Sequence, residues 1–588
     1  MPHLTQPASL LAMAGALALA GPTADASGAQ PILSPAPGTP TAMPASEISF
    51  LGAAAGTLSA ITVIGSLSGR HRGRLRAYSS ALGASFRPAL PFTPGEHVSV
   101  RARWRGASGH PIALSSSFTV ARPVPLTPSA PPPDPGPAEV QSFRSAPGLH
   151  PPTVTVHRAG AGAPGYLFAA PASAAAQSGP MIFADSGALV WFKALPAGQQ
   201  AAGLRTQDFH GKNDLTWWEG TTDSLGYGQG KDVIVNANYR PVSVVRAGNG
   251  LAADEHQFIV GSEGSAWLLA YSPVRSNLAG AGGPAGGIAI EGVVQEIDIH
   301  TGLVMWEWHS LGHIAPSESY APPPQAAESP YDYLHIDSLD IDGYGNLLLS
   351  ARNTSALYAI DGRSGAVLWR LGGRRSSFAL GAGVPFANQE DASFLPGHEI
   401  GLIDGGGVPG SGGAPRGEVI KLDEAARTAS LALGLDHRGG TLPGTGGGNL
   451  QALPGGGWLT GWGTGGELTE FNSAGQIVYD AGLPTALDSH SIYREPWGGL
   501  PSSAPALSEV NAGSQSIVYA SWNGATVATS WQLLTGSNPN HMTPFSTTPW
   551  SGFETSIPAP SAAFYEVRAL SASGKVLRAS GVLAAGGG

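Results

Sequence analysis

Histidine is the residue type best placed to do chemistry in this chain, because its 16 copies meet little competition from lysine. His256 lies in the string DEHQF and His335 in YDYLHIDSLD, and Arg352 follows shortly in SARN. Arginine offers two parallel N–H donors and a protonated histidine adds another, so together they suit an anion such as sulfate or phosphate. The sequence therefore indicates an anion-binding site, provided that these side chains converge.

Other candidate residues lie in separate strings. Glu390 lies in NQEDA, His398 follows in PGH, and Trp217 with Trp218 could form an aromatic wall for a phenolic ring. Each candidate also has a structural interpretation. His256 could be a turn residue beside two acids, Arg352 could pair with an aspartate such as Asp340, and the tryptophans could pack in a core.

Several classes of function lack their signature in this sequence. There are no cysteines, no glycine-rich loop ending in Gly-Lys-Ser/Thr and no His-Glu-x-x-His, so thiolate and common metal or nucleotide motifs are missing. The net charge of -10 argues against nucleic acid and against a polybasic membrane patch. We therefore expect no cofactor, no metal and no nucleic-acid partner.

A repeated pattern occupies the middle of the chain: a short apolar run, a polar turn closed by glycine, and a second run that ends in an aromatic residue. Four clear copies are closed by Gly187, Gly302, Gly365 and Gly475. Weaker copies at 237–245 and 422–431 fall in the long gaps, which makes six units of about 50–60 residues. Polar turns closed by glycine are hairpin chemistry, so the pattern predicts a six-bladed β-propeller, whose blade loops would bring equivalent positions to one axis.

The flanking segments predict further β structure, so the chain as a whole is expected to be all-β. Short alternating runs separated by turn residues predict an N-terminal β-sandwich and a C-terminal sandwich of the immunoglobulin or fibronectin type. An apolar run followed by Ala24-Asp25-Ala26 predicts a signal peptide and hence export to the cell envelope or beyond. The predicted organisation is signal peptide 1–26, linker 27–46, sandwich 47–122, Pro-rich linker 123–150, propeller 151–496 and C-terminal sandwich 515–586.

Several of these strings resemble the bacterial arylsulfotransferase (aryl-sulfate sulfotransferase) family over about 151–496. The strings are DYLHIDSLD, with Asp337 where the family has Asn, together with SARN and NLQALPGGGWLTGWG. The resemblance implies a six-bladed propeller that moves a sulfuryl group from a phenolic sulfate ester to another phenol without a nucleotide donor.

By the same resemblance, His256, His335 and Arg352 would hold the sulfate oxygens, and a nucleophilic histidine would stand at position 390 in a Gln-His-x-Ala string. Here the string is QEDA, so a carboxylate, Glu390, replaces the nucleophile. Imidazole is the better carrier of a sulfuryl group, because it is largely neutral near pH 7 and its adduct stays activated. Three interpretations follow: the propeller is non-catalytic or altered, His398 or another nearby histidine acts instead, or Glu390 activates water for hydrolysis.

Two functional hypotheses therefore remain. The first is an exported arylsulfotransferase-like enzyme whose partners are small phenols and their sulfate esters. The second is an extracellular binding or adhesion protein built on the same scaffold. Glu390, in place of a nucleophilic histidine, favours this second hypothesis. No segment after the N-terminal run reaches the roughly 18 uncharged apolar residues of a membrane span, so we do not expect an integral membrane protein; the sequence leaves the oligomeric state open.

Overall fold

The chain is an all-β protein. The computed structural model describes residues 30–586 apart from 107–108, 126–138, 161, 173–175, 224, 262, 407–412, 438–445, 464 and 485–486. The predicted signal peptide over 1–26 and much of the predicted linker over 123–150 lie outside the described residues. Strands and four short 3-10 helices make up the secondary structure of the described part, and no helix there is long and apolar enough to cross a membrane.

The N-terminal module consists of two four-stranded antiparallel sheets around one core. The first sheet is β1 (Ile32–Ser34), β2 (Ile48–Leu51), β6 (Gly83–Pro88) and β5 (Gly73–Ala77). The second sheet is β4 (Gly69–His71), β3 (Leu58–Gly65), β7 (His97–Arg105) and β8 (Pro111–Thr119). Alternate residues of β7 are buried, and Phe50 of one sheet shares a core with Val100 and Phe118 of the other. The linker predicted over 27–46 is therefore corrected in part: β1 lies inside it and pairs with β2. Its apolar run is too short to give a strand signal among the prolines.

Six sheets follow one another between residues 155 and 495. The first is β12 (Leu189–Phe192), β11 (Met181–Phe183), β10 (Tyr166–Ala169) and β35 (Ile492–Glu495). The second is β13 (Gln200–Phe209), β14 (Lys212–Thr222), β15 (Gly228–Val235) and β16 (Pro241–Val245). The third is β17 (Phe258–Val260), β18 (Ser265–Ser276), β19 (Gly287–Asp298) and β20 (Val304–His309), with β21 (Pro330–Tyr331) beside β19.

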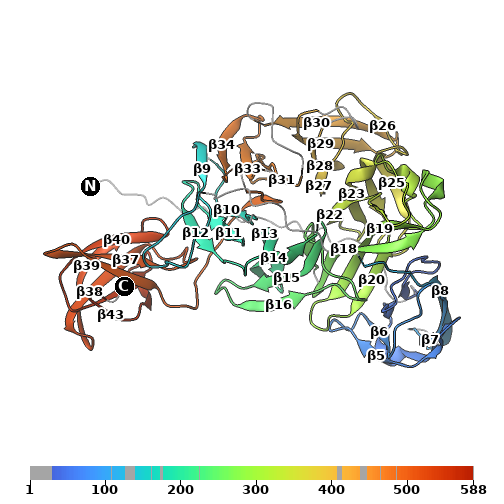
Figure 1. Ribbon diagram of the computed structural model, residues 1–588, viewed down its shortest axis with the longest axis horizontal. Coiled ribbons are helices and arrows are strands. Elements are labelled where there is room, and N and C mark those ends of the chain that lie inside the picture. Colours follow the sequence, from blue (N-terminus) through green and yellow to red (C-terminus); the bar gives the residue numbers. More distant parts are fainter. Residues whose placement is uncertain are drawn as a thin grey trace, which may run out of the picture.

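The remaining three sheets continue the same order. The fourth is β22 (Ile336–Ile341), β23 (Leu347–Ala351), β24 (Ala356–Ile360) and β25 (Val367–Gly372). The fifth is β27 (Glu390–Leu395), β28 (Glu399–Asp404), β29 (Arg416–Asp423), β30 (Thr428–Asp436) and β26 (Ala379–Leu380). The sixth is β31 (Asn449–Ala452), β32 (Trp458–Gly461), β33 (Glu467–Phe471), β34 (Ile477–Gly482) and β9 (Thr155–Arg158). Figure 1 shows β13, β22, β27 and β31 near the middle of the six sheets.

The hairpins predicted from the repeated pattern are confirmed. The four closing glycines all have positive φ, of 78° at Gly187, 69° at Gly302, 73° at Gly365 and 72° at Gly475. Each lies in the turn of an antiparallel strand pair of a different sheet. The two weaker copies cover the β15–β16 and β29–β30 hairpins. The positive φ explains why glycine closes the turns, since a side chain there would be strained.

The C-terminal module again has two sheets around one core. One sheet is β36 (Ala506–Asn511), β37 (Gln515–Ser521) and β40 (Glu554–Pro560). The other is β39 (His541–Pro549), β38 (Ser530–Asn538), β41 (Phe564–Leu570) and β42 (Val576–Ala579), with β43 (Leu583–Ala584) beside β41. The core contains Trp522, Trp531 and Tyr565. The module starts at β36, ahead of the boundary predicted at 515.

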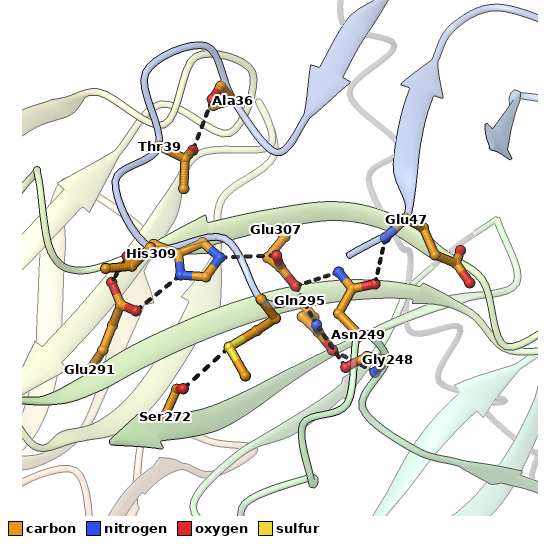
Figure 2. A network of polar contacts seen from close by, with 12 residues as sticks. Ala36, Thr39, Glu47, Gly248, Asn249, Ser272, Glu291, Gln295, Glu307 and His309 are labelled. Carbon is orange, nitrogen blue, oxygen red and sulfur yellow. Dashed lines mark hydrogen bonds and ion pairs between the residues drawn. The ribbon is translucent and has the colours of Figure 1, made fainter. Parts of the chain in front are cut away.

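A buried polar network joins the N-terminal module to the third sheet (Figure 2). His309 Nδ1 lies 3.2 Å from Glu291 and its Nε2 lies 2.9 Å from Glu307. The side-chain amide of Asn249 donates to Glu307 at 2.7 Å, and its oxygen accepts from the backbone N–H of Glu47 at 2.9 Å. Burial alone would lower the pKa of His309, but Glu291 and Glu307 raise it to about 10. The histidine is therefore an imidazolium ion held between two carboxylates.

Candidate functional site

The residues predicted for the anion site come together from three neighbouring sheets. His256 lies just before β17, His335 just before β22 and Arg352 just after β23, while Glu390 opens β27. The rings of His256 and His335 lie 5.4 Å apart, centroid to centroid, at an interplanar angle of 87°. The charges of both histidines and of Arg352 act on the buried Glu390 carboxyl. The four side chains thus form one cluster.

His256 is held in place through one ring nitrogen. Its Nδ1 and its backbone N–H both donate to Asp254, which also accepts the backbone N–H of Gly228 at 2.6 Å. Burial would lower the pKa of His256, but the Asp254 carboxylate raises it to about 10. The ring is therefore protonated near neutral pH, and among the described residues its Nε2 has no hydrogen-bond partner.

His335 and Arg352 are tied to one another through the backbone. His335 adopts a φ of 52°, and its carbonyl accepts the backbone N–H of Arg352 at 2.9 Å. Its Nδ1 bonds to Asp332 at 2.7 Å, which leaves Nε2 for another partner. The guanidinium of Arg352 makes no ion pair or hydrogen bond with the described residues. The alternative of a structural pair with Asp340 fails, because no hydrogen bond or ion pair joins the two residues, and Asp340 accepts the backbone N–H of Phe394 at 2.8 Å.

Two buried carboxyl groups lie beside these cations. Glu390 is 3% exposed and its Oε1 accepts the backbone N–H of Gly447 at 3.3 Å. Burial raises the pKa of Glu390, although Arg352 and His256 act in the opposite direction. Burial also raises the pKa of Asp337 well above its usual value, and the neighbouring Glu390 adds to this effect. Two carboxyls that disfavour each other's charge hold protons more readily than isolated ones.

Two tyrosines that sequence reasoning missed lie against His335. The ring of Tyr227 lies 5.6 Å from His335, that of Tyr271 lies 6.1 Å from it, and the two tyrosine rings are 4.3 Å apart. Both tyrosines line a cleft of about 1270 Å³, including its part open to solvent, and Met43 and Pro123 line it as well. No sequence signal distinguishes them, because an isolated tyrosine is ordinarily explained by packing alone.

His490, also missed, completes the cluster. It lies just ahead of β35, and its ring is 4.9 Å from His256 at an angle of 89°. It lines the same pocket as His256 and Asp337. Burial lowers the pKa of His490 to about 3, and the positive charge of His256 adds to this, so the ring is neutral. Its string, DSHSIYRE, offered a weak signal: a histidine between serines directly before a strand.

The tryptophan pair is divided by the alternation of β14. Trp218 lines the pocket of His256 and donates its Nε1–H to the carbonyl of Ala253 at 2.9 Å. Trp217 points to the other face, is 1% exposed in the core and bonds to Glu219 at 3.1 Å. The prediction that Trp217 contacts substrate is corrected for this reason: successive side chains of a strand face opposite sides.

His398 does not belong to the cluster. It is exposed in the turn that follows β27, whereas Glu390 opens that strand. A strand rises about 3.3 Å per residue, which separates the two ends of β27 by roughly 17 Å. The interpretation in which His398 replaces the missing nucleophile is therefore wrong.

Comparisons with known proteins identify a family for part of the chain. Residues 205–483 match the model of the arylsulfotransferase (ASST) family. No curated protein matches the chain.

Among solved structures, a protein of unknown function from Bacteroides caccae is 15% identical, with a TM-score of 0.35 over 56% of this chain and 98% of its own. A protein from Lactobacillus plantarum is 11% identical, with a TM-score of 0.30 over 71% of this chain and 97% of its own. At these TM-scores neither likeness supports an argument. The family match thus covers residues 205–483 of this chain, which are similar to the arylsulfotransferase (ASST) family.

Proposed function

We propose that this protein is an exported sulfotransferase that moves a sulfuryl group from a phenolic sulfate ester to a phenol without a nucleotide donor. The observation that carries the proposal is the cluster of His256, His335 and Arg352. Each histidine bonds to an aspartate through Nδ1 and has an unpaired Nε2, and the guanidinium of Arg352 has no partner among the described residues. The Nε2–H of the protonated His256 and the planar guanidinium of Arg352 are donors of the kind that bind sulfate oxygens, and His335 presents its unpaired Nε2 beside them.

The positive charge on His256 assists departure of the phenol, because this ring can supply the proton that the leaving oxygen needs. His256 has a pKa raised to about 10 by Asp254 against the effect of burial, so it is protonated at neutral pH. That value is close to the pKa of about 10 of a phenolic hydroxyl, so His256 can pass a proton to the departing phenolate oxygen with little cost. Asp254 keeps the ring oriented with Nε2 unpaired.

The aryl group has a matching surface in Tyr227 and Tyr271. Their rings contact the His335 ring and continue into the adjacent cleft. Stacked or edge-on aromatic contacts contribute about 0.5–1.5 kcal/mol beyond simple burial. A phenolic ester can thus lie with its sulfate at the histidines and its ring in the cleft.

For the fold, we propose that the six sheets close into a six-bladed propeller with the cluster at its axis, flanked by immunoglobulin-like modules. Two pairings support closure: the late strand β35 pairs with the early strand β10, and β9 pairs with β34. Contacts between neighbouring inner strands give further support, since β13 touches β35 and β17, and β27 touches β22 and β31. Inner strands that meet in this way bring blade loops to one axis.

The non-catalytic alternative rests on Glu390, which stands where the family resemblance expects the nucleophile. In this alternative, the exported protein binds a partner through the same scaffold. Export in both versions depends on the apolar segment within 1–26, and it is tested by sequencing the N-terminus of the mature protein.

The experiment that tests the activity is release of nitrophenolate from 4-nitrophenyl sulfate with phenol as acceptor. We expect the wild type to release nitrophenolate, and we expect His335→Ala and Arg352→Ala to lose that activity while they remain folded. A silent wild type with an active Glu390→His variant would indicate a sulfate pocket that has lost its carrier. If neither the wild type nor the Glu390→His variant releases nitrophenolate while both are folded, the non-catalytic binding function is the one that remains.

A further inference from the structure

We propose that His490 is the residue that accepts the sulfuryl group in this protein, in place of the histidine missing at position 390. The inference rests on the proposed function and names the carrier at that same site. Three observations support it: the place of the ring, its freedom from partners, and its charge state.

His490 reaches the surroundings of Glu390 from a different sheet. The backbone N–H of Gly447 donates to the Glu390 carboxylate at 3.3 Å, and the next residue, Gly448, donates its N–H to the His490 carbonyl at 2.8 Å. One dipeptide therefore bridges the two residues. Gly447 has a φ of 74°, and a Cβ on it would lie 3.3 Å from Cδ2 of the His490 ring. Glycine at this position leaves the space in which the ring lies.

The ring of His490 is unpaired and faces the sulfate-binding histidines. Neither of its nitrogens makes a hydrogen bond or ion pair within the described part of the chain. It packs edge-on against His256 at 4.9 Å, while His256 in turn contacts His335 and Tyr271. His490 makes no ring contact with either tyrosine. His490 therefore lies apart from the tyrosines that would hold the aryl group, and an in-line displacement needs such a separation between nucleophile and leaving group.

The neighbours of His490 also keep it neutral. Burial and the charge of His256 lower its pKa to about 3, so a ring nitrogen has its lone pair at any ordinary pH. His256 and His309, by contrast, are protonated and have no lone pair to give. Glu390 would form a mixed anhydride that water destroys quickly, whereas an imidazole adduct persists long enough to be passed on.

The reaction then has two balanced steps. In the first, the His490 lone pair forms an N–S bond as the S–O(aryl) bond breaks, and the phenolate leaves with that electron pair and takes a proton from His256. In the second, the acceptor phenol forms an O–S bond as the N–S bond breaks. The electron pair returns to His490, and the acceptor's proton goes to His256. Both residues end as they began.

The test uses the full chain and 4-nitrophenyl [³⁵S]sulfate. Without acceptor, the wild type should release up to one equivalent of nitrophenolate in a burst, and the label should be found on the peptide that carries His490. With phenol as acceptor, His490→Asn should lose on the order of 10⁴-fold or more in kcat, as expected for a nucleophile. The matched control is His398→Asn, at an exposed turn position with a φ of 61° that asparagine tolerates, and it should keep wild-type activity and labelling.

The other outcomes separate the inference about His490 from the proposed function. If the wild type is active but its label lies on another residue, or if folded His490→Asn keeps its kcat, the inference about His490 is overturned while the proposed function stands. If the wild type neither releases nitrophenolate nor takes up label, the proposed function fails and the inference fails with it. Should His490→Asn not fold, the position of the label in the wild type still gives the answer.

Discussion

Two parts of this molecule bury histidines among carboxylates, and they use them differently. His309, at the junction with the N-terminal module, engages Glu291 and Glu307 with both ring nitrogens. His256 and His335 each engage one aspartate through Nδ1. His256 and His309 share a pKa of about 10, so the charge alone does not separate structure from chemistry. The difference is the unpaired Nε2 of His256 and of His335, which leaves both rings available to a ligand.

The largest effect should come from His309→Ala. It leaves Glu291 and Glu307 buried without a cation, and breaking a buried pair in this way costs about 3–5 kcal/mol. Urea unfolding of the full chain should show the loss, while kcat per folded molecule stays unchanged. The exposed His300→Ala variant is the control. A stable His309→Ala protein that has lost its activity would contradict the division between the two regions.

Arg352→Ala should show the opposite pattern to His309→Ala, with stability retained and activity reduced. Its guanidinium supports no structural contact in the described chain, so the free energy of unfolding should change little. Removal of one donor to the developing negative charge should lower kcat/KM for 4-nitrophenyl sulfate by about 10²–10³-fold. The exposed Arg363→Ala variant should change neither quantity. A destabilised Arg352→Ala protein with normal kcat/KM would give Arg352 the structural role instead.

Asp254→Asn should shift the pH profile. In the wild type, His256 is protonated below about pH 10, so its contribution to kcat/KM is lost only as the pH rises through that value. Without the Asp254 charge, burial lowers the pKa of His256, and the alkaline limb of the profile should move to lower pH. The profile is measured with 4-nitrophenyl sulfate. An unmoved limb would show that His256 is not the group that titrates.

The smallest effect is expected of Glu390→Gln. Burial raises the pKa of Glu390, and its protonation removes a negative charge beside the bound sulfate. The KM of the wild type should therefore fall as the pH falls, and that of the variant should be nearly flat and lower by about fivefold, or about 1 kcal/mol. Steady-state kinetics across the pH range measures this. A higher KM in Glu390→Gln would mean that the carboxylate helps the substrate to bind.

Sequence reasoning could reach those features that depend on local chemistry. The glycine-closed turns predicted four of the six hairpins, because glycine adopts the positive φ of such turns without strain. The resemblance predicted His256, His335 and Arg352, which do converge. Alternation in a strand would have separated Trp217 from Trp218, but the face that each residue occupies depends on the register with β13 and β15.

The features missed depend on contacts between distant segments. His490 lies just ahead of β35 and meets His256 because β35 pairs with β10, a strand more than 300 residues earlier in the chain. Tyr227, in the segment before β15, meets Tyr271 of β18. The strand β1, inside a proline-rich segment, gains its place by pairing with β2 rather than by its own propensity.

The most direct test of the central claim is to follow where the sulfuryl group goes. With 4-nitrophenyl sulfate and excess phenol, the account predicts that phenyl sulfate forms in the same amount as nitrophenolate is released, with no added nucleotide. Release of inorganic sulfate in place of phenyl sulfate would contradict it. That result would mean that water is the acceptor and that the buried carboxylate, Glu390, has turned the site into a hydrolase.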